Sequence, residues 1–165
     1  MGGRNSIDIA YVKSVLSYNQ KTGVLRWTDP SGYKVQPGSV AGYALKRGNI
    51  IVMIDGRNYQ AHRLAWAMHY GTEPPGTLDH IDGNPSNNRI DNLREATPSQ
   101  NGGNSRKSRR GLKGAYPMSN HWRWTTKIRA HGVSRYIGSF DTEVEAHEAY
   151  RQAAIKLFGE FARFE

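Results

Sequence analysis

The chain has 165 residues, enough for one ordinary domain or two small ones, and its 23 Lys and Arg against 14 Asp and Glu give a formal net charge of +9. It contains no cysteine, which excludes disulfides, cysteine-ligated zinc and thiol catalysis, and no apolar run approaches the roughly 18 residues of a membrane-spanning helix. The charge is unevenly distributed along the chain, because residues 96–140 hold nine Lys and Arg and no Asp or Glu. This basic segment indicates a polyanionic partner such as nucleic acid. The alternative is a basic surface without a specific partner.

The first third of the chain predicts one short helix and a small antiparallel β region. Apolar residues recur at helical spacing within residues 6–17, so we expect an amphipathic helix there with Ser6 as its N-cap. A strand is expected at residues 24–27. Residues 50–54 form a β-branched run that stops at Asp55-Gly56, a strong hairpin signal. No catalytic chemistry is visible in this segment.

A helix and an unusually polar stretch follow. Residues 62–70 predict a two-turn helix that ends at Gly71. Residues 78–94 are rich in Asn and Asp, and two further asparagines follow at Asn101 and Asn104. Asn and Asp side chains commonly bond their own backbone, so the simplest interpretation of this stretch is a long polar turn.

The spacing within this stretch resembles the HNH nucleases, also called the ββα-metal nucleases, and especially their phage and intron homing-endonuclease branch. The pattern of that branch is present in order as residues 79–84 (DHIDGN), residues 87–94 (NNRIDNLR) and the asparagines of residues 101–104. Residues 62–66 (HRLAW) resemble the segment that precedes the motif. The resemblance implies an α+β protein with a ββα-metal nuclease unit, acting as a metal-dependent DNA endonuclease of the homing type found in phages and mobile elements.

The resemblance also implies a role for each motif residue. Hydrolysis of a phosphodiester needs an activated water and a counter-charge for the phosphate, and a histidine can supply the base because its pKa lies near neutral pH. His80 matches the family's general base, and Asp79 matches its metal carboxylate. Asn92 matches the asparagine that braces the loop and helps to orient the base. Asn101 takes the third, metal-binding position, with Asn104 as the competing assignment.

Oxygen ligands of this kind suit a divalent cation, with Mg²⁺ the first choice, Mn²⁺ the second and no zinc expected. His62 and His69 share one face of the predicted helix but have no third ligand, so we expect His62 to pack or hydrogen-bond near the site. Asp82 is interpreted as a turn residue because Gly83 follows it.

The last third of the chain predicts a basic arm, two strands and a helix. Residues 102–111 are small and basic, as in a flexible arm that lies along phosphates or in a solvated linker. Residues 122–129 alternate between an apolar and a basic face, which is typical of a half-buried strand, and residues 135–140 are its partner. Residues 143–158 carry the apolar stripe of a helix that lies on a sheet.

This final segment resembles an Apetala-two-type DNA-binding domain across residues 111–165. The resemblance is carried by residues 113–115 (KGA), 124–129 (WTTKIR), 137–142 (IGSFDT), 146–154 (AHEAYRQAA) and 159–162 (GEFA). It implies a three-stranded antiparallel sheet packed on one helix, with the sheet reading the DNA major groove. Lys113 and Tyr136 stand where the family has Arg and Trp. Trp124 is expected in the core, whereas the place of Trp122 stays open.

The chain is therefore expected to comprise a nuclease domain at residues 1–104, a basic linker at residues 105–111 and a DNA-binding domain at residues 112–165. The predicted DNA contacts are cationic or aromatic side chains of the linker and the C-terminal sheet: Arg106, Lys107, Arg109, Arg110, Lys113, Arg123, Lys127, Arg129, Arg135 and Tyr136.

The expected partner is double-stranded DNA in the cytoplasm or nucleoid of a bacterial host, with no membrane and no protein partner implied. A monomer with one such site would nick, whereas a dimer could cut both strands, and both alternatives stay open. A non-catalytic, sequence-specific DNA-binding regulator with a vestigial motif and an RNA-directed nuclease are the alternative functions.

Overall fold

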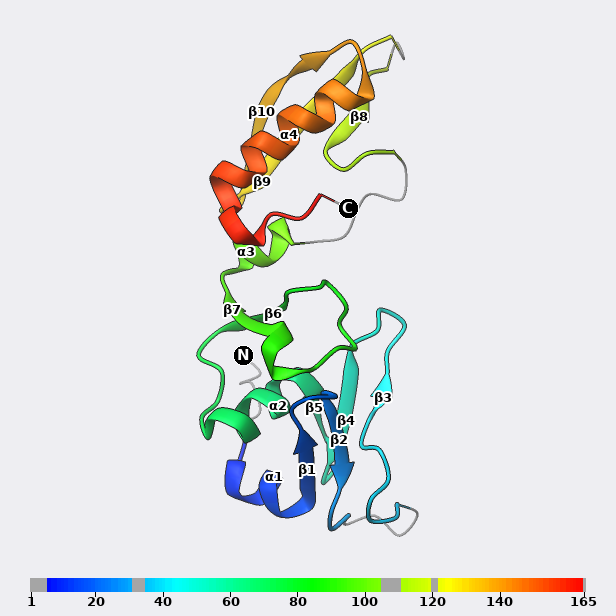
Figure 1. Cartoon of the computed structure of the whole chain (residues 1–165), viewed down its shortest axis with the longest axis vertical. Coiled ribbons are helices and arrows are strands. Elements are labelled where there is room, and N and C mark those ends of the chain that lie inside the picture. Colours follow the sequence, from blue (N-terminus) through cyan, green and yellow to red (C-terminus); the bar gives the residue numbers. More distant parts are fainter. Residues whose placement is uncertain (1–5, 31–34, 105–110, 120–121, 165) are drawn as a thin grey trace. The chain divides into compact units, whose positions relative to one another are not determined.

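The computed structural model describes residues 6–30, 35–104, 111–119 and 122–164, which form an α+β protein as predicted (Figure 1). The chain divides into two compact units, unit 1 (Met1–Glu95) and unit 2 (Ala96–Glu165). The predicted boundary after residue 104 falls later than this division, which therefore places helix α3 (Pro98–Gly103) in unit 2. No helix among the described residues is long and apolar enough to cross a membrane.

Unit 1 begins with helix α1 (Ile9–Val15), which is shorter than the predicted helix. Its N-cap is Asp8, not Ser6, because the Asp8 carboxylate accepts a hydrogen bond from the backbone N–H of Tyr11 at 3.0 Å. From Leu16 the backbone is extended, and strand β1 (Leu16–Asn19) pairs antiparallel with strand β2 (Val24–Trp27).

A second sheet of unit 1 contains β3 (Tyr43–Ala44), β4 (Ile50–Ile54) and β5 (Arg57–Gln60), antiparallel in that order. The expected hairpin at Asp55-Gly56 is present, with positive φ angles of 48° and 74°. Helix α2 (Ala61–Tyr70) follows β5 and ends at Gly71, whose φ of 73° is left-handed as in many helix C-caps.

The core of unit 1 joins α1, α2 and the two sheets. Leu16, Val52 and Leu64 are its most deeply buried large side chains, with exposures of 1%, 0% and 0%. Because a buried Leu or Val stabilises the fold by about 1.5–3 kcal/mol, this core fixes the rotation of α2 and therefore the direction of its polar residues.

The predicted strand–strand–helix order is present after α2. Strands β6 (Thr77–His80) and β7 (Leu93–Ala96) pair in a two-stranded sheet, and the polar loop between them ends in the short 3₁₀ turn η1 (Ile90–Asn92). Helix α3 follows directly and begins with a capping box between Thr97 and Gln100.

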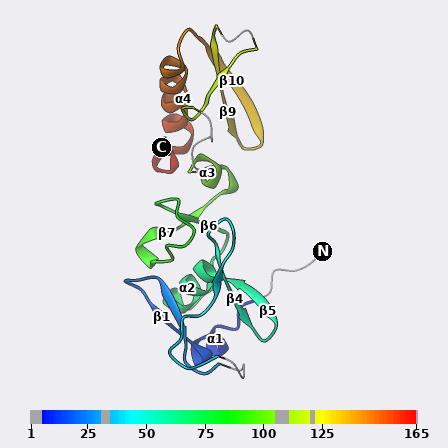
Figure 2. The same cartoon turned by 90° about the vertical axis from the view of Figure 1, so that its right-hand side faces the viewer.

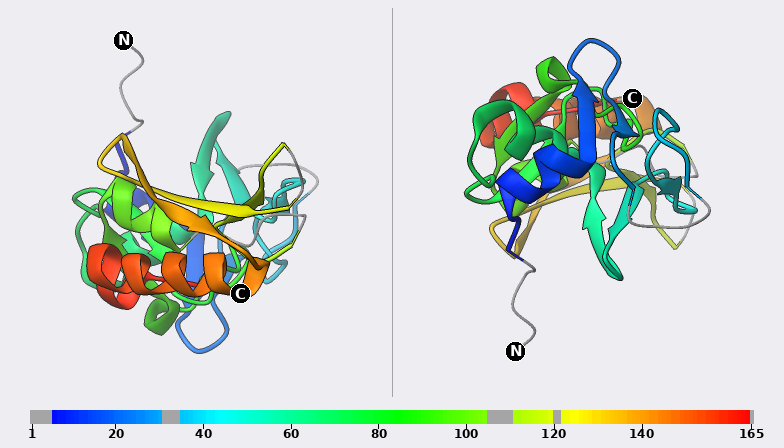
Figure 3. Two further views of the ribbon diagram at one scale, coloured as in Figure 1. Left: turned by 90° about the horizontal axis from the view of Figure 1, so that it is seen from above. Right: turned by 90° about the horizontal axis from the view of Figure 1, so that it is seen from below.

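Unit 2 contains the predicted sheet and helix. Strands β8 (Ala115–Pro117), β9 (Trp124–Ala130) and β10 (Val133–Phe140) are antiparallel with β9 in the centre. Helix α4 (Glu143–Phe158) lies along one face of this sheet, as Figures 2 and 3 show, and the turn η2 (Gly159–Phe161) follows it. The prediction of a three-stranded antiparallel sheet packed on one helix is confirmed.

Candidate functional site

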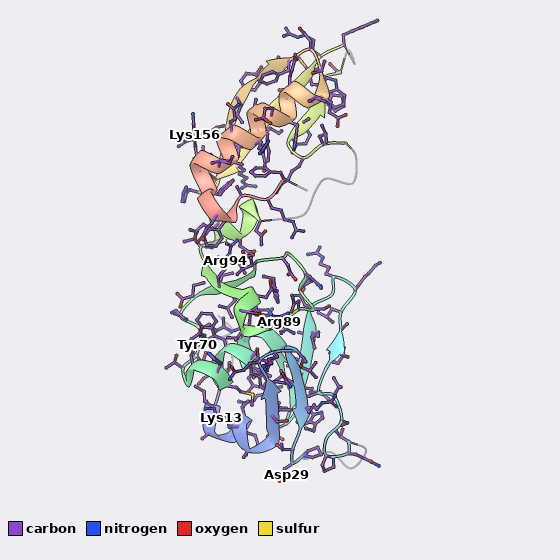
Figure 4. The ribbon with its side chains drawn as sticks, viewed as in Figure 1. Lys13, Asp29, Tyr70, Arg89, Arg94 and Lys156 are labelled. Atoms are coloured by element: carbon purple, nitrogen blue, oxygen red, sulfur yellow. The ribbon has the colours of Figure 1, made fainter. Side chains whose placement is uncertain are left out.

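Strand β6 ends with the two residues of greatest chemical interest in unit 1. Asp79 and His80 are both buried, with exposures of 3% and 8%. The Asp79 carboxylate forms an ion pair with Arg94 of β7, in which Oδ2 lies 3.0 Å from Nε (Arg94 is labelled in Figure 4). Because both partners are largely shielded from water, this pair fixes the direction of the carboxylate.

His80 is held by an amide and by a second imidazole. Its Nε2 lies 3.1 Å from Oδ1 of Asn88 in the loop after β6. The ring of His62, on α2, stands edge-on to it, with centroids 5.1 Å apart and an angle of 83° between the planes. The expectation that His62 packs near the site is confirmed, and the contact comes from the first turn of α2.

His62 is a neutral, buried ring. Its Nδ1 is buried and has no hydrogen-bond partner among the described residues. Burial, with smaller contributions from the neighbouring His80 and Arg63, lowers the pKa of His62 to about 3. The side chain therefore carries no charge near neutral pH.

Asn92 braces the loop between β6 and β7. Its Nδ2 donates to Oδ1 of Asp82 at 3.0 Å and to the carbonyl of Asn87 at 2.8 Å, while its Oδ1 accepts from the backbone N–H of Asp82 at 3.0 Å. Burial raises the pKa of Asp82, but hydrogen bonds from Asn87, Asn84 and Asn92 outweigh it and the pKa is lowered. Asp82 thus serves the turn, as expected.

The N-terminal hairpins support the same loop. Gly23, in the β1–β2 turn with a φ of 72°, approaches the loop so closely that a Cβ there would lie 2.5 Å from the backbone nitrogen of Arg89. In the β3–β4 turn, the carbonyl of Gly48 accepts a 2.6 Å hydrogen bond from the Ser86 hydroxyl. The N-terminal β region therefore holds the loop although it contributes no catalytic group, a function that the sequence did not reveal.

The two asparagines proposed for the third position lie in unit 2. Asn101 is half-buried on α3, whereas Asn104 is buried at 5% exposure and forms the C-cap of that helix, donating its backbone N–H to the carbonyl of Gln100 at 3.1 Å. Their relation to Asp79 stays a prediction from the resemblance.

One face of the unit 2 sheet is basic. Lys127 and Arg129 on β9 are exposed, while the alternate residues Thr126 and Ile128 are buried beneath α4, as the alternation predicted. Tyr136, 68% exposed, lies opposite Lys127 in the register. The Lys127 ammonium also lies 5.7 Å from the centroid of the Tyr116 ring of β8.

Other predicted DNA contacts differ in their placement. Arg123 is exposed immediately before β9 and pairs with Asp141, with Nε 3.2 Å from Oδ1. Arg135 is exposed too, but the register places it opposite Ile128, so it lies on the sheet face that α4 covers and not with Lys127. Trp122 is 84% exposed, and Trp124 is half-buried.

Lys113 is the clearest departure from expectation. Its side chain is buried at 6% exposure, and Nζ donates to the backbone carbonyls of Gly103 at 3.0 Å and Arg163 at 2.7 Å. Burial also lowers the pKa of this ammonium to about 8. An ammonium held in this way cannot reach a phosphate, so we replace the predicted DNA contact with an internal tie between α3 and the C-terminal segment. The remaining predicted contacts, Arg106, Lys107, Arg109 and Arg110, lie outside the described residues.

Comparison with known proteins identifies a family for the segment that contains Asp79 and His80. A family model described as HNH endonuclease matches residues 59–102, from β5 to α3. The chain is 33% identical over 139 residues to "Uncharacterized HNH endonuclease L560" of Acanthamoeba polyphaga mimivirus. This match covers 83% of this chain and 69% of that protein. The chain is 36% identical over 107 residues to "Protein 3.8" of Escherichia phage T7. This match covers 62% of this chain and 88% of that protein. No solved structure matches.

Proposed function

Because the chain belongs to the HNH endonuclease family, we propose that it is a metal-dependent endonuclease that hydrolyses phosphodiester bonds of double-stranded DNA. The observation that carries this proposal is the burial of Asp79 and His80 side by side at the end of β6, inside the matched segment. Its phage and viral relatives favour a homing-type role in a mobile element.

The pairing of Asp79 with Asn101 as ligands of a hard divalent cation rests on the resemblance to the family, and the oxygen chemistry of the two side chains suits such a cation. Asp79 offers a carboxylate that Arg94 already holds in place, and Asn101 offers an amide oxygen on the half-buried part of α3. Mg²⁺ and Mn²⁺ take such oxygens, usually from one or two protein side chains, and Asn101 is preferred to Asn104 because Asn104 is buried as the helix cap. When bound, the ion supplies positive charge that stabilises the phosphate as negative charge develops on it.

The protein's own groups would handle the proton and the positioning. His80 accepts the proton from the attacking water, since a neutral imidazole is a competent base near neutral pH. Asn92 keeps the loop closed around the base through Asp82 and the Asn87 carbonyl. His62 remains uncharged beside His80, so it does not compete for the proton.

Incubation of supercoiled plasmid with the purified chain tests the enzyme function. We expect relaxed or linear plasmid with Mg²⁺ or Mn²⁺ and unchanged plasmid with EDTA, because the reaction needs the cation. Relaxed circles alone indicate nicking, and full-length linear product indicates cleavage of both strands. If the protein binds the plasmid but leaves it intact in every metal, the alternative function of a DNA-binding regulator replaces the endonuclease.

The exposed sheet face of unit 2 is the proposed DNA-binding surface, in keeping with its resemblance to an Apetala-two-type domain. The double substitution Lys127→Ala and Arg129→Ala should weaken binding and reduce the slope of log affinity against log salt by about 2, close to one for each phosphate that is no longer neutralised. Fluorescence anisotropy with labelled duplex DNA at several salt concentrations measures this slope.

Lys156→Ala is the matched control, because Lys156 is an exposed cation of the same unit on α4 rather than on the sheet face (Figure 4). Its salt slope should stay at the wild-type value. An unchanged slope in the double variant would show that this face does not contact DNA.

A further inference from the structure

Asn88 is buried at a place where its amide needs a specific partner. It lies in the polar loop between β6 and β7, yet it is 1% exposed and ranks among the most completely buried large side chains of the described residues. Burying an amide is unfavourable unless it forms hydrogen bonds. The partner of its Oδ1 is Nε2 of His80 at 3.1 Å.

The β1–β2 hairpin, which lies far from Asn88 in the sequence, holds the backbone of Asn88 in place. The Tyr18 hydroxyl of β1 donates to the backbone carbonyl of Asn88 at 2.8 Å. Burial and the Asp91 carboxylate raise the pKa of Tyr18 to about 12, so this donor keeps its proton at working pH. Gly23 also packs closely against this backbone, since a Cβ built there would lie 2.6 Å from the carbonyl carbon of Asn88.

The direction of the His80 contact determines which imidazole nitrogen bears the proton. An amide oxygen can only accept a hydrogen bond, so the ring nitrogen facing it must donate. In a neutral imidazole the other nitrogen then has an unprotonated lone pair. The edge-on ring of His62 lies beside His80 and restricts rotation of the ring away from this arrangement.

We propose that Asn88 is a positioning residue that holds His80 in the Nε2–H tautomer, so that Nδ1 is the atom that accepts the proton from water. The choice of Nδ1 as the proton acceptor rests on the proposed function, whereas the tautomer itself does not. The N-terminal hairpin thereby acquires a role in the reaction, since it holds the residue that orients the base.

Nitrogen-15 NMR of the imidazole rings tests the tautomer directly. The full chain is measured with EDTA at a pH where the rings are neutral, and the His80 signals are identified by their loss in His80→Gln. We expect the Nε2–H pattern. An Nδ1–H pattern, or an even mixture of both, in the wild-type protein would overturn the proposal, and this measurement requires no Asn88 variant to fold.

Substitution then tests whether Asn88 is the cause. Asn88→Ala should give a mixture of tautomers and lower kcat by about 10- to 100-fold with little change in KM for DNA, a typical effect of losing a group that orients a ligand or base. Asn88→Asp keeps an oxygen acceptor and should restore the Nε2–H pattern. Persistence of the pure Nε2–H tautomer in Asn88→Ala would refute the role of Asn88.

Asn87→Ala is the matched control, because Asn87 lies in the same loop but donates its amide to Asp82 at 2.7 Å. Its tautomer pattern should match the wild type, and a mixture there would assign the effect to loop disorder instead of the Asn88 amide. A wild-type protein that shows the Nε2–H pattern but no metal-dependent cleavage would refute the proposed function while supporting the positioning contact.

Discussion

His80→Ala is expected to slow DNA cleavage by about 100- to 10,000-fold, the usual contribution of a general base, while DNA affinity changes little. The side chain is buried at 8% exposure, so it contributes little surface to DNA binding. Removing the imidazole removes the group that takes the proton from water, but it leaves Asp79 and its ion pair with Arg94 in place. Single-turnover cleavage of a labelled duplex measures the rate, and anisotropy with EDTA measures the affinity.

The control for this experiment is His69→Ala, which removes an exposed histidine from α2. It should cleave at the wild-type rate. The substitution His80→Ala leaves a space beside His62, so circular dichroism is used to check that the variant is folded. A folded His80→Ala protein that cleaves at the wild-type rate would show that another group is the base, and cleavage lost together with DNA binding would point to a structural role.

The elements that the sequence predicted well depend on local interactions. The Asp55-Gly56 hairpin follows from turn residues that accept positive φ, and α4 follows from an apolar stripe with a capping box at Thr142 and Glu145. The alternation along β9 correctly separated Lys127 and Arg129 from the core. The order of β6, loop, β7 and α3 was implied by the resemblance to the HNH nucleases, whose motif residues are close in the chain.

The support of the site could not be predicted, because it comes from contacts between distant parts of the chain. Tyr18 and Asn88 are 70 residues apart, and no periodicity or turn signal connects them. Asn88 and Arg94 both lie inside the recognised motif, but composition alone does not distinguish a buried amide from an exposed one. The N-terminal strands lack catalytic side chains, so their contribution became visible only in their contacts with the loop.

Contacts between distant parts of the chain also determine where Lys113 and helix α3 lie. Lys113 was assigned to DNA because it stands where the Apetala-two-type family has Arg. The backbone carbonyls of Gly103 and of Arg163, which is 50 positions further along the chain, hold its ammonium inside the fold. Helix α3 was assigned to the nuclease domain because its asparagines complete the motif. The HNH endonuclease match, residues 59–102, includes most of this helix, while its packing is in unit 2, where a Cβ on Gly103 would lie 2.6 Å from the Phe158 ring. Net charge therefore indicated a polyanionic partner, but burial determines which Lys and Arg side chains can contact it.

Acidification is expected to destabilise unit 1 through His62. Its pKa is lowered from 6.5 to about 3 in the folded protein, chiefly by burial, so the unfolded chain takes up a proton that the folded chain refuses. The stabilising effect is fully present above pH 6.5 and is lost as the pH falls from there towards 3. Between pH 7 and pH 4 this one group should lower the free energy of unfolding by about 3 kcal/mol.

His62→Phe isolates this contribution, because phenylalanine keeps an aromatic ring beside His80 and removes Nδ1, which bonds to no other group in the part of the chain that the structure describes. Other groups also titrate in this range, so the measured quantity is the difference in pH dependence between wild type and variant, with EDTA present. Hydrogen exchange of peptides from unit 1 reports the unfolding of that unit alone. His69→Gln, an exposed change on the same helix, should retain the wild-type dependence. Equal acid sensitivity in wild type and His62→Phe would contradict the prediction, because a buried neutral imidazole must add to the proton uptake on unfolding.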